Sequence, residues 1–301
     1  MQGCVPLRGG ATLNCVSELQ TVLFHLSDIH FGLEDRLALA WVERCIAEER
    51  PAAILITGDV TMRARSREFA AAIDWIGALG PPVTVEVGNH DMPYFNLAER
   101  FFTPYRRFRK IERLLERQLD LPGVAVVPLK TATRAQWRFP WSNGWVTPRA
   151  LAETLAAIDA LPRSTRIIVT AHHPLTERDP RGKLLTIGGD RAIAALAVRG
   201  VDAVLTGHVH DAFDLVAASA HGPLRMIGAG TLSRRIRSTP CSFNQLTITD
   251  AGIAVTVRNV DEVPTASMQI GQVPENALPP REAYEPVAPV GYVPAIDPPV
   301  S

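Results

Sequence analysis

The sequence predicts an α/β domain, because short runs rich in aliphatic and β-branched residues alternate with longer segments of helical periodicity. At 301 residues, of which 47% are hydrophobic, the chain can bury one large core or two modest ones. Basic and acidic residues number 31 each, so no bulk electrostatic field draws the chain to nucleic acid or to an anionic membrane. Any recognition of an anion must therefore be local.

The expected elements alternate along most of the chain. Buried strands are predicted at residues 21–27, 52–57, 83–87, 166–171 and 202–206. Helices are predicted at residues 37–48, 66–79, 148–161 and 190–199. The helical pattern stops after about residue 213, and consecutive antiparallel strands are predicted at residues 223–229, 242–249 and 252–259.

The chain divides into a central domain at residues 21–260, an N-terminal extension at 1–20 and a tail at 261–301. Nine prolines punctuate the tail, so we expect an extended segment without a core of its own. Residues 94–121 are expected to form a helical insertion with an apolar face and a basic face. We interpret the insertion as a packed helix with a solvated basic side; the alternative is a lid that supplies cations to a phosphorylated substrate.

The cysteines are too widely spaced for a CxxC pair or a dense disulfide framework. They are Cys4, Cys15, Cys45 and Cys241. The N-terminal segment lacks the continuous apolar stretch of a signal peptide, and no segment has the length needed to span a bilayer. These features predict reduced thiols in a cytoplasmic protein without a membrane span, and they leave its oligomeric state open.

Asp, His and Asn side chains come directly after the expected strands. They are Asp28 and His30, then Asp59, then Asn89, His90 and Asp91, then His172 and His173, and finally His208 and His210. Because the carboxyl ends of parallel strands share one edge of an open sheet, we expect these five motifs to converge. Oxygen and imidazole ligands without a thiolate suit ions such as Mn, Fe, Zn or Co, and a carboxylate such as Asp59 can bridge two of them. Glycines at positions 58, 88 and 207 are expected to let the backbone turn sharply beside the ligands.

The five motifs, in this order, resemble those of the calcineurin-like metallophosphoesterase superfamily, whose pattern is D-x-H, G-D, G-N-H-[DE], H-x-P and G-H-x-H. The resemblance covers roughly residues 21–250. It implies a four-layer αββα fold, in which two packed mixed β-sheets are flanked by helices, and a dinuclear centre of divalent or mixed-valence ions. One ion would be held by Asp28, His30 and His210 and the other by Asn89, His172 and His208, with Asp59 bridging the two.

His90 lies outside that ligand set. The resemblance implies that the two ions activate a water for in-line attack on phosphorus, while His90 protonates or stabilises the departing oxygen. Asp91 is expected to orient His90 or to cap the following segment. The remaining histidines, His25, His173 and His221, are expected to have structural or turn roles rather than to bind metal.

Departures from related patterns narrow the substrate class. Protein Ser/Thr phosphatases of the superfamily continue the second motif as Asp-Arg-Gly, whereas this chain continues with Val60 and Thr61. The UDP-diacylglucosamine pyrophosphohydrolases usually carry arginine where this chain has His90. The motifs together look most like the bacterial branch that includes the cyclic-AMP phosphodiesterases. Three arginines near the C-terminal strands, at positions 234, 235 and 237, could reach a substrate phosphate or form structural pairs, and we do not count them in the site.

The resemblance therefore implies a metal-dependent phosphodiesterase that acts on a small phosphorylated, nucleotide-like substrate, with a cyclic nucleotide as the favoured example. No specific nucleic-acid partner is expected. A phosphomonoesterase or another phosphohydrolase on the same site is the alternative. A non-catalytic scaffold that keeps the fold is a third interpretation, which the intact ligand pattern disfavours.

Overall fold

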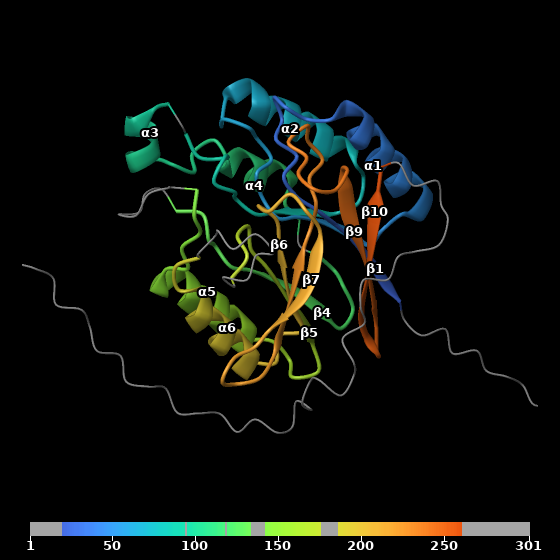
Figure 1. The fold of residues 1–301 in the computed structure, drawn as a ribbon, viewed down its shortest axis with the longest axis vertical. Coiled ribbons are helices and arrows are strands. Elements are labelled where there is room, and N and C mark those ends of the chain that lie inside the picture. Colours follow the sequence, from blue (N-terminus) through green and yellow to red (C-terminus); the bar gives the residue numbers. More distant parts are fainter. Residues whose placement is uncertain (1–19, 94, 118, 134–141, 176–185, 261–301) are drawn as a thin grey trace, which may run out of the picture.

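Two five-stranded β-sheets pack face to face between two layers of helices in the computed structural model, which describes residues 20–93, 95–117, 119–133, 142–175 and 186–260 (Figure 1). The strands are β1 (Thr21–Leu26), β2 (Ala53–Ile56), β3 (Val83–Val85), β4 (Val124–Pro128), β5 (Arg166–Thr170), β6 (Ala203–Thr206), β7 (Phe213–Ala217), β8 (Leu224–Gly228), β9 (Ser242–Thr249) and β10 (Gly252–Asn259). The helices are α1 (Arg36–Glu49), α2 (Ser66–Ala78), α3 (Leu97–Phe102), α4 (Arg109–Leu115), α5 (Pro148–Asp159) and α6 (Gly189–Val198).

Both sheets are mixed, as the resemblance implies. The first has the order β10-β9-β1-β2-β3, in which β1, β2 and β3 are parallel while β9 and β10 are antiparallel to their neighbours. The second has the order β4-β5-β6-β8-β7, with four parallel strands and an antiparallel β7. The register pairs Leu26 of β1 with Ile56 of β2. The two strands therefore end together, and the motifs that follow them are brought side by side.

Aliphatic side chains from both sheets fill the layer between them. Leu23 of β1, Leu55 of β2 and Ile168 of β5 are fully buried in this one cluster. Because side chains alternate across a strand, the neighbouring Phe24 and Ile54 face the helices on the other side of the first sheet. Burial of both faces explains why these strands appear in the sequence as continuous apolar runs.

The helices cover the outer faces of the sheets, which gives the four αββα layers. α1 and α2 pack on the first sheet, and α5 and α6 pack on the second (Figure 1). The carboxylate of Asp35 caps α1 by accepting from the backbone N–H groups of Leu37 and Ala38 at 2.9 and 3.1 Å. The described part of the chain contains no helix with the length and hydropathy needed to cross a bilayer.

The prediction of consecutive antiparallel strands is correct for β9 and β10, which pair with each other, but wrong for β8. β8 lies in the second sheet, parallel to β6, whereas β9 and β10 pair in the first sheet. Residue patterning identifies a strand but not its partner. The sequence therefore could not predict that β8 joins one sheet while β9 and β10 join the other. β4 and β7 were not predicted at all. β7 contains Asp214, which strands usually avoid, and Arg225 of β8 neutralises it through a 2.6 Å ion pair.

The insertion forms two short helices rather than one. Pro104 lies between α3 and α4, where it would interrupt a continuous helix. Phe108 and Ile111, at the start of α4, are 1% and 0% exposed and belong to the core beneath α2. α4 is therefore packed into the domain.

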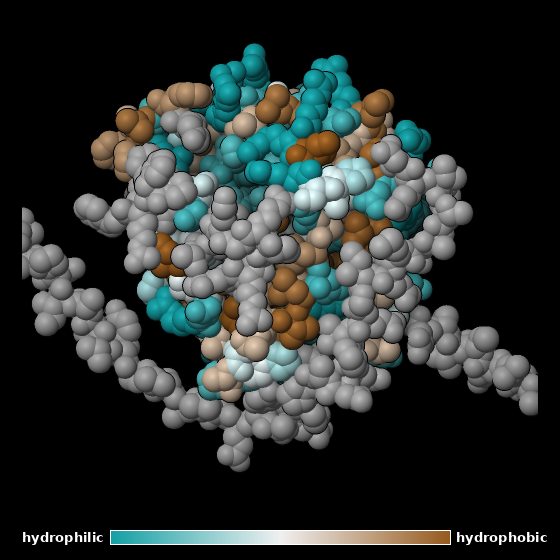
Figure 2. Space-filling view, viewed as in Figure 1, coloured by the Kyte–Doolittle hydropathy of each residue, from teal (hydrophilic) through white to brown (hydrophobic). Residues whose placement is uncertain are grey.

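α3 differs from α4 because it projects apolar side chains outward. Leu97, Phe101 and Phe102 are 54%, 40% and 82% exposed. Figure 2 shows tan and brown atoms gathered at the corner that α3 occupies in Figure 1. Behind this surface, the buried Glu99 accepts from Arg106 and Arg107 at 2.9 and 2.7 Å. These two cations are engaged structurally, whereas the lid role and the domain boundaries stay predictions. Apart from Gln20, the N-terminal extension and the tail lie outside the described residues.

Replacing Phe108 with alanine should reduce the free energy of unfolding by about 3–5 kcal/mol, because it leaves a large cavity in the core beneath α2. Denaturant unfolding measures the loss. Phe102→Ala, on the exposed face of α3, is the matched control and should change stability by no more than about 0.5 kcal/mol. Equal small losses in both variants would mean that α4 is a detachable lid.

Candidate metal centre

The motifs that follow β1, β2, β3, β5 and β6 converge at one end of the paired sheets. Three groups of side chains each place their ligand atoms within 4.8 Å of one another. They are Asp28, His30 and His210; Asp28, Asp59 and His172; and His172, His173 and His208. The predicted convergence of the motifs is therefore present, and the assignment of each residue to a metal remains a proposal.

The first predicted ligand set is compact. His210 Nε2 lies 3.1 Å from Asp28 Oδ1 and 3.2 Å from His30 Nε2. The distance from His30 Nε2 to Asp28 Oδ1 is 3.6 Å. The carboxylate oxygen and two imidazole nitrogens thus face a common point.

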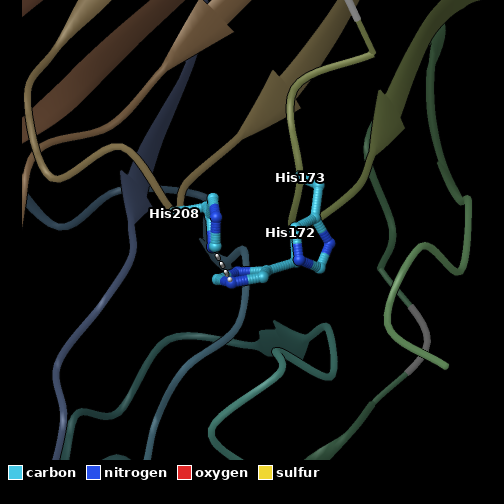
Figure 3. A group of neighbouring side chains, drawn as sticks. All are labelled: His172, His173 and His208. Atoms are coloured by element: carbon cyan, nitrogen blue, oxygen red, sulfur yellow. Dashed lines mark hydrogen bonds between the residues drawn. The ribbon is translucent and has the colours of Figure 1, made fainter. Parts of the chain in front are cut away.

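The second predicted set surrounds His172. Its Nε2 atom lies 3.2 Å from Asn89 Oδ1 and 3.3 Å from His208 Nδ1, the contact drawn as a dashed line in Figure 3. Asp59 Oδ2 lies 3.3 Å from His172 Nε2 and 3.8 Å from His30 Nε2. The carboxylate of Asp59 therefore stands between the two sets, in the position that a bridging ligand requires.

Hydrogen bonds behind the imidazoles orient their ligand atoms. His172 Nδ1 donates to the carbonyl oxygen of Thr57 at 2.7 Å, and His210 Nδ1 donates to that of Arg235, also at 2.7 Å. Since a carbonyl can only accept, each Nδ1 carries a proton, and in the neutral form of each ring the Nε2 lone pair faces inward. This is the tautomer that metal binding through Nε2 requires.

Unsatisfied buried atoms show that the residues fit a cation. Asp28 Oδ1 and His30 Nδ1 are buried and have no hydrogen-bond partner. Leaving a buried carboxylate oxygen without a donor costs about 1–3 kcal/mol or more. A cation bound at Asp28 Oδ1 would remove that penalty, so the donor set is compatible with the two ions that the resemblance implies.

The backbone is strained at most of the predicted ligands. Seven non-glycine residues among those described have positive φ, and five of them are predicted ligands. The five are Asp28 (52°), His30 (51°), Asp59 (51°), His208 (70°) and His210 (68°). Such left-handed conformations cost about 1–3 kcal/mol each and persist only where the surrounding structure enforces them. Their concentration here supports a functional site.

The three glycines act in two different ways. Gly58 has a φ of 99° and makes the predicted sharp turn. Gly88 and Gly207 do not have positive φ, so that explanation is wrong for them. A Cβ atom at Gly88 would collide with the carboxylate of Asp59, and one at Gly207 would collide with the hydroxyl of Ser27. These two glycines allow neighbouring loops to approach closely.

The carboxylates and imidazoles in the centre shift one another's pKa values. Burial alone would raise the pKa of Asp28, but His210 and His30 outweigh it and hold that pKa well below its usual range. Burial would lower the pKa of His172, but Asp59 raises it to about 9. Burial and the nearby His172 lower the pKa of His208 to about 3. Because metal binding needs neutral imidazole, an ion bound at His172 would displace a proton.

Asp91 has neither of the predicted roles. Its Oδ1 atom accepts from the backbone N–H and the hydroxyl of Thr61 at 2.8 and 2.9 Å, and its Oδ2 atom accepts from Gly88 N–H at 2.9 Å. Burial, followed by repulsion from Asp59, raises the pKa of Asp91 to about 7. The side chain ties the loop after β2 to the loop after β3, which positions Asp59 beside Asn89.

His90 lies beside the ligand sets, as the sequence predicts. Its backbone N–H donates to Asp59 Oδ1 at 2.8 Å, which leaves Asp59 Oδ2 to face the ligands. Its Nδ1 donates to the carbonyl oxygen of Met62 at 2.8 Å, so Nε2 is directed into the centre. The ring meets His30 edge to face, with the centroids 4.9 Å apart. A chemical role for His90 remains a proposal.

His173 has no nitrogen available for metal, although it lies beside His172 and His208 (Figure 3). Its Nε2 donates to the carbonyl oxygen of Ser142 at 2.9 Å, and its Nδ1 accepts from the hydroxyl of Thr131 at 2.9 Å. These two bonds support the predicted structural role, which stays a prediction because His173 also belongs to one of the three candidate groups. His173 fixes the segments around residues 131 and 142 next to the centre.

The other two excluded histidines also match their predictions. His25 is fully buried in β1, and its Nε2 atom lies 3.0 Å from the hydroxyl of Thr57. His221 lies in an exposed turn, where its backbone N–H donates to Ser219 Oγ at 3.2 Å. Neither side chain belongs to the three candidate metal groups.

Arg235 reaches the centre, although it is not among the predicted site residues. Its Nη1 atom lies 3.1 Å from His90 Nε2 and 3.2 Å from His30 Nε2. Its neighbours Arg234 and Arg237 are exposed. Three arginines so close in one segment cannot be distinguished by composition, because the local path of the loop decides which one turns inward.

Comparison with known proteins adds independent support for the fold. A family model described as calcineurin-like phosphoesterase matches residues 21–212. No curated protein sequence shows detectable similarity to the chain.

Solved structures with the same fold are distant in sequence. A dimetal phosphatase from Danio rerio superposes with a TM-score of 0.59 at 13% identity, covering 83% of this chain and 99% of its own. The purple acid phosphatase PPD1 from yellow lupin seeds also gives 0.59, at 12% identity, covering 83% of this chain and 53% of its own. GAP50, described as the anchor in the inner membrane complex of Plasmodium, superposes with a TM-score of 0.55 at 15% identity, covering 87% of this chain and 96% of its own.

At such low identity these structures establish the fold alone. The family model, in contrast, spans well over half of the chain and contains all five motifs. The protein belongs to the calcineurin-like phosphoesterase family.

Proposed function

We propose that the protein is a dinuclear-metal-dependent phosphodiesterase that hydrolyses a small nucleotide-like diester, such as a cyclic nucleotide, in the cytoplasm. The observation that carries the metal site is the position of Asp59 Oδ2 between two convergent ligand sets, next to the unsatisfied Asp28 Oδ1. Asp28, His30 and His210 would hold one ion, Asn89, His172 and His208 the other, and Asp59 both.

Two bound ions would supply Lewis acidity, which makes water a stronger acid and neutralises phosphoryl oxygens. The chain supplies the remaining functions. The Thr57 and Arg235 carbonyls hold imidazoles in the required tautomer, and the Asp91 carboxylate holds the loops together. His90 Nε2 is directed into the centre by the bond from Nδ1 to Met62, and when the ring carries a second proton, on Nε2, it would donate that proton or a hydrogen bond to the departing oxygen.

The two alternatives are a phosphomonoesterase and a non-catalytic scaffold. A phosphomonoesterase would use the same ligands, and the resemblance of the motifs to the cyclic-AMP phosphodiesterase branch is what favours a diester. A scaffold would not need an orphaned carboxylate oxygen or strained ligand backbones. GAP50 illustrates that the fold also occurs in a protein described as an anchor.

We expect the Mn²⁺-loaded protein to hydrolyse bis(p-nitrophenyl) phosphate with a higher kcat/KM than p-nitrophenyl phosphate. The same preparation should contain a pair of ions per chain by elemental analysis, and a chelator should abolish the activity. A preference for the monoester would support the phosphomonoesterase instead. If the protein hydrolysed neither ester and bound no metal, the result would support the non-catalytic scaffold.

A further inference from the structure

We propose that Arg235 binds a terminal phosphoryl oxygen and so gives the site affinity for phosphomonoester dianions and inorganic phosphate, in addition to diesters. The inference rests on the proposed dinuclear site. It assigns a substrate-binding role to a side chain outside the five motifs. Three features of the structure support it: the anchored backbone of Arg235, its contact with the lone pair of His30 Nε2, and the absence of an anionic partner for its charge among the described residues. The difference in charge between monoesters and diesters then determines which substrate Arg235 favours.

The backbone of Arg235 is anchored to the ligand loops. Its carbonyl oxygen accepts from His210 Nδ1 at 2.7 Å, and its N–H donates to Ser233 Oγ at 3.3 Å. Ser233 Oγ lies 2.7 Å from Thr231 Oγ1, which donates to the carbonyl oxygen of Asp28, also at 2.7 Å. The guanidinium therefore starts from a segment that is fixed to the motifs following β1 and β6.

The contact between Arg235 and His30 is incompatible with a loaded centre. Nη1 lies 3.2 Å from His30 Nε2, the atom proposed to bind an ion. A neutral imidazole nitrogen has one lone pair, so it can accept from Arg235 or bind an ion but cannot do both. Ion binding to His30 would thus leave an N–H of Arg235 without this acceptor.

The positive charge of Arg235 has no anionic partner among the described residues. Other partly buried arginines do have one: Arg225 pairs with Asp214 at 2.6 Å, and Arg107 pairs with Glu99 at 2.7 Å. Arg235 instead faces two imidazoles, which offer no negative charge. A half-buried guanidinium is always protonated and gains most from an anion that accepts hydrogen bonds.

The charge of the substrate decides how much Arg235 contributes. A phosphomonoester carries about two negative charges and three terminal oxygens above its second pKa of about 6. A diester carries one negative charge and only two terminal oxygens. An additional cation with N–H donors therefore stabilises a bound monoester or inorganic phosphate more than a bound diester.

The direct test is calorimetric titration of inorganic phosphate into Mn²⁺-loaded protein. Arg235→Ala should raise the Kd about 10- to 100-fold, which is the scale of one charged hydrogen bond. Arg235→Lys should lie between that variant and the wild type. Arg234→Ala, one residue earlier and exposed, is the matched control and should leave the Kd within about twofold. Elemental analysis should find the same metal content in all four proteins.

The kinetic test is the ratio of kcat/KM for p-nitrophenyl phosphate to that for bis(p-nitrophenyl) phosphate. Arg235→Ala should lower this ratio about tenfold, because the monoester loses more than the diester. Equal losses on both esters with an unchanged phosphate Kd would overturn the inference and make Arg235 a support for His90 and His210. So would a wild-type protein that does not bind phosphate.

Failure of the proposed hydrolysis has a different signature. Phosphate binding requires no turnover, so calorimetry reports on Arg235 even if neither ester is cleaved. A wild-type protein that binds phosphate through Arg235 but hydrolyses nothing would support this inference and contradict the proposed function.

Discussion

Asp59→Ala should abolish both metal retention and hydrolysis, reducing turnover to that of the metal-free protein. Asp59 Oδ2 approaches ligands of both sets, at 3.3 Å from His172 Nε2 and 3.8 Å from His30 Nε2. Its removal should therefore release both ions rather than one. Elemental analysis after gel filtration measures retention, and ester hydrolysis measures activity.

Asp59→Asn separates loss of charge from loss of structure. The amide oxygen can still accept from the backbone N–H of His90, a bond of 2.8 Å in the native protein, so the loop after β3 should keep its position. Thermal unfolding of both variants shows whether they remain folded. Retention of a full pair of ions by folded Asp59→Ala would show that Asp59 does not bridge them.

His90→Ala should keep both ions but slow turnover by about 10²- to 10⁴-fold on a substrate with a poor leaving group. The imidazole is outside the proposed ligand sets, and its Nε2 faces the centre. A p-nitrophenolate departs with little help, whereas a ribose alkoxide needs a proton. The loss should therefore be smaller on bis(p-nitrophenyl) phosphate than on a cyclic nucleotide, as kcat for each substrate will show.

His221→Ala, at an exposed turn, is the matched control and should leave both rates unchanged. Equal losses on the two substrates would indicate that His90 acts in phosphoryl binding, through its 3.1 Å contact with Arg235, rather than in protonation. Because the two side chains touch, the double variant His90→Ala with Arg235→Ala would then lose less than the sum of the single losses. Loss of a metal from His90→Ala would make His90 a ligand.

The sequence was sufficient to identify the convergence of the ligands because each one directly follows a strand. Strand registers such as Leu26 with Ile56 then align the strand ends and bring Asp28 near Asp59. Local patterning also separated His25 from the ligands, since it lies within β1 rather than after it.

What the sequence could not supply depends on contacts between distant segments. Arg235 and Arg234 have identical chemistry, and only the path of the loop after β8 turns one of them toward His90. The role of Asp91 depends on backbone donors 30 residues away at Thr61. The need for Gly88 comes from the side chain of Asp59, which approaches it only in the folded chain. These are properties of packing and not of local pattern.

The proposed ligands come unequally from the two sheets. Asp28, Asp59 and Asn89 follow strands of the first sheet, together with His30, whereas the other three follow strands of the second. Neither sheet alone could complete either ligand set, because His210 is needed with Asp28 and His172 with Asn89. Ions held there would cross-link the two sheets where they meet. By thermodynamic linkage, the free energy of binding them would also be free energy that keeps the two halves of the sandwich docked.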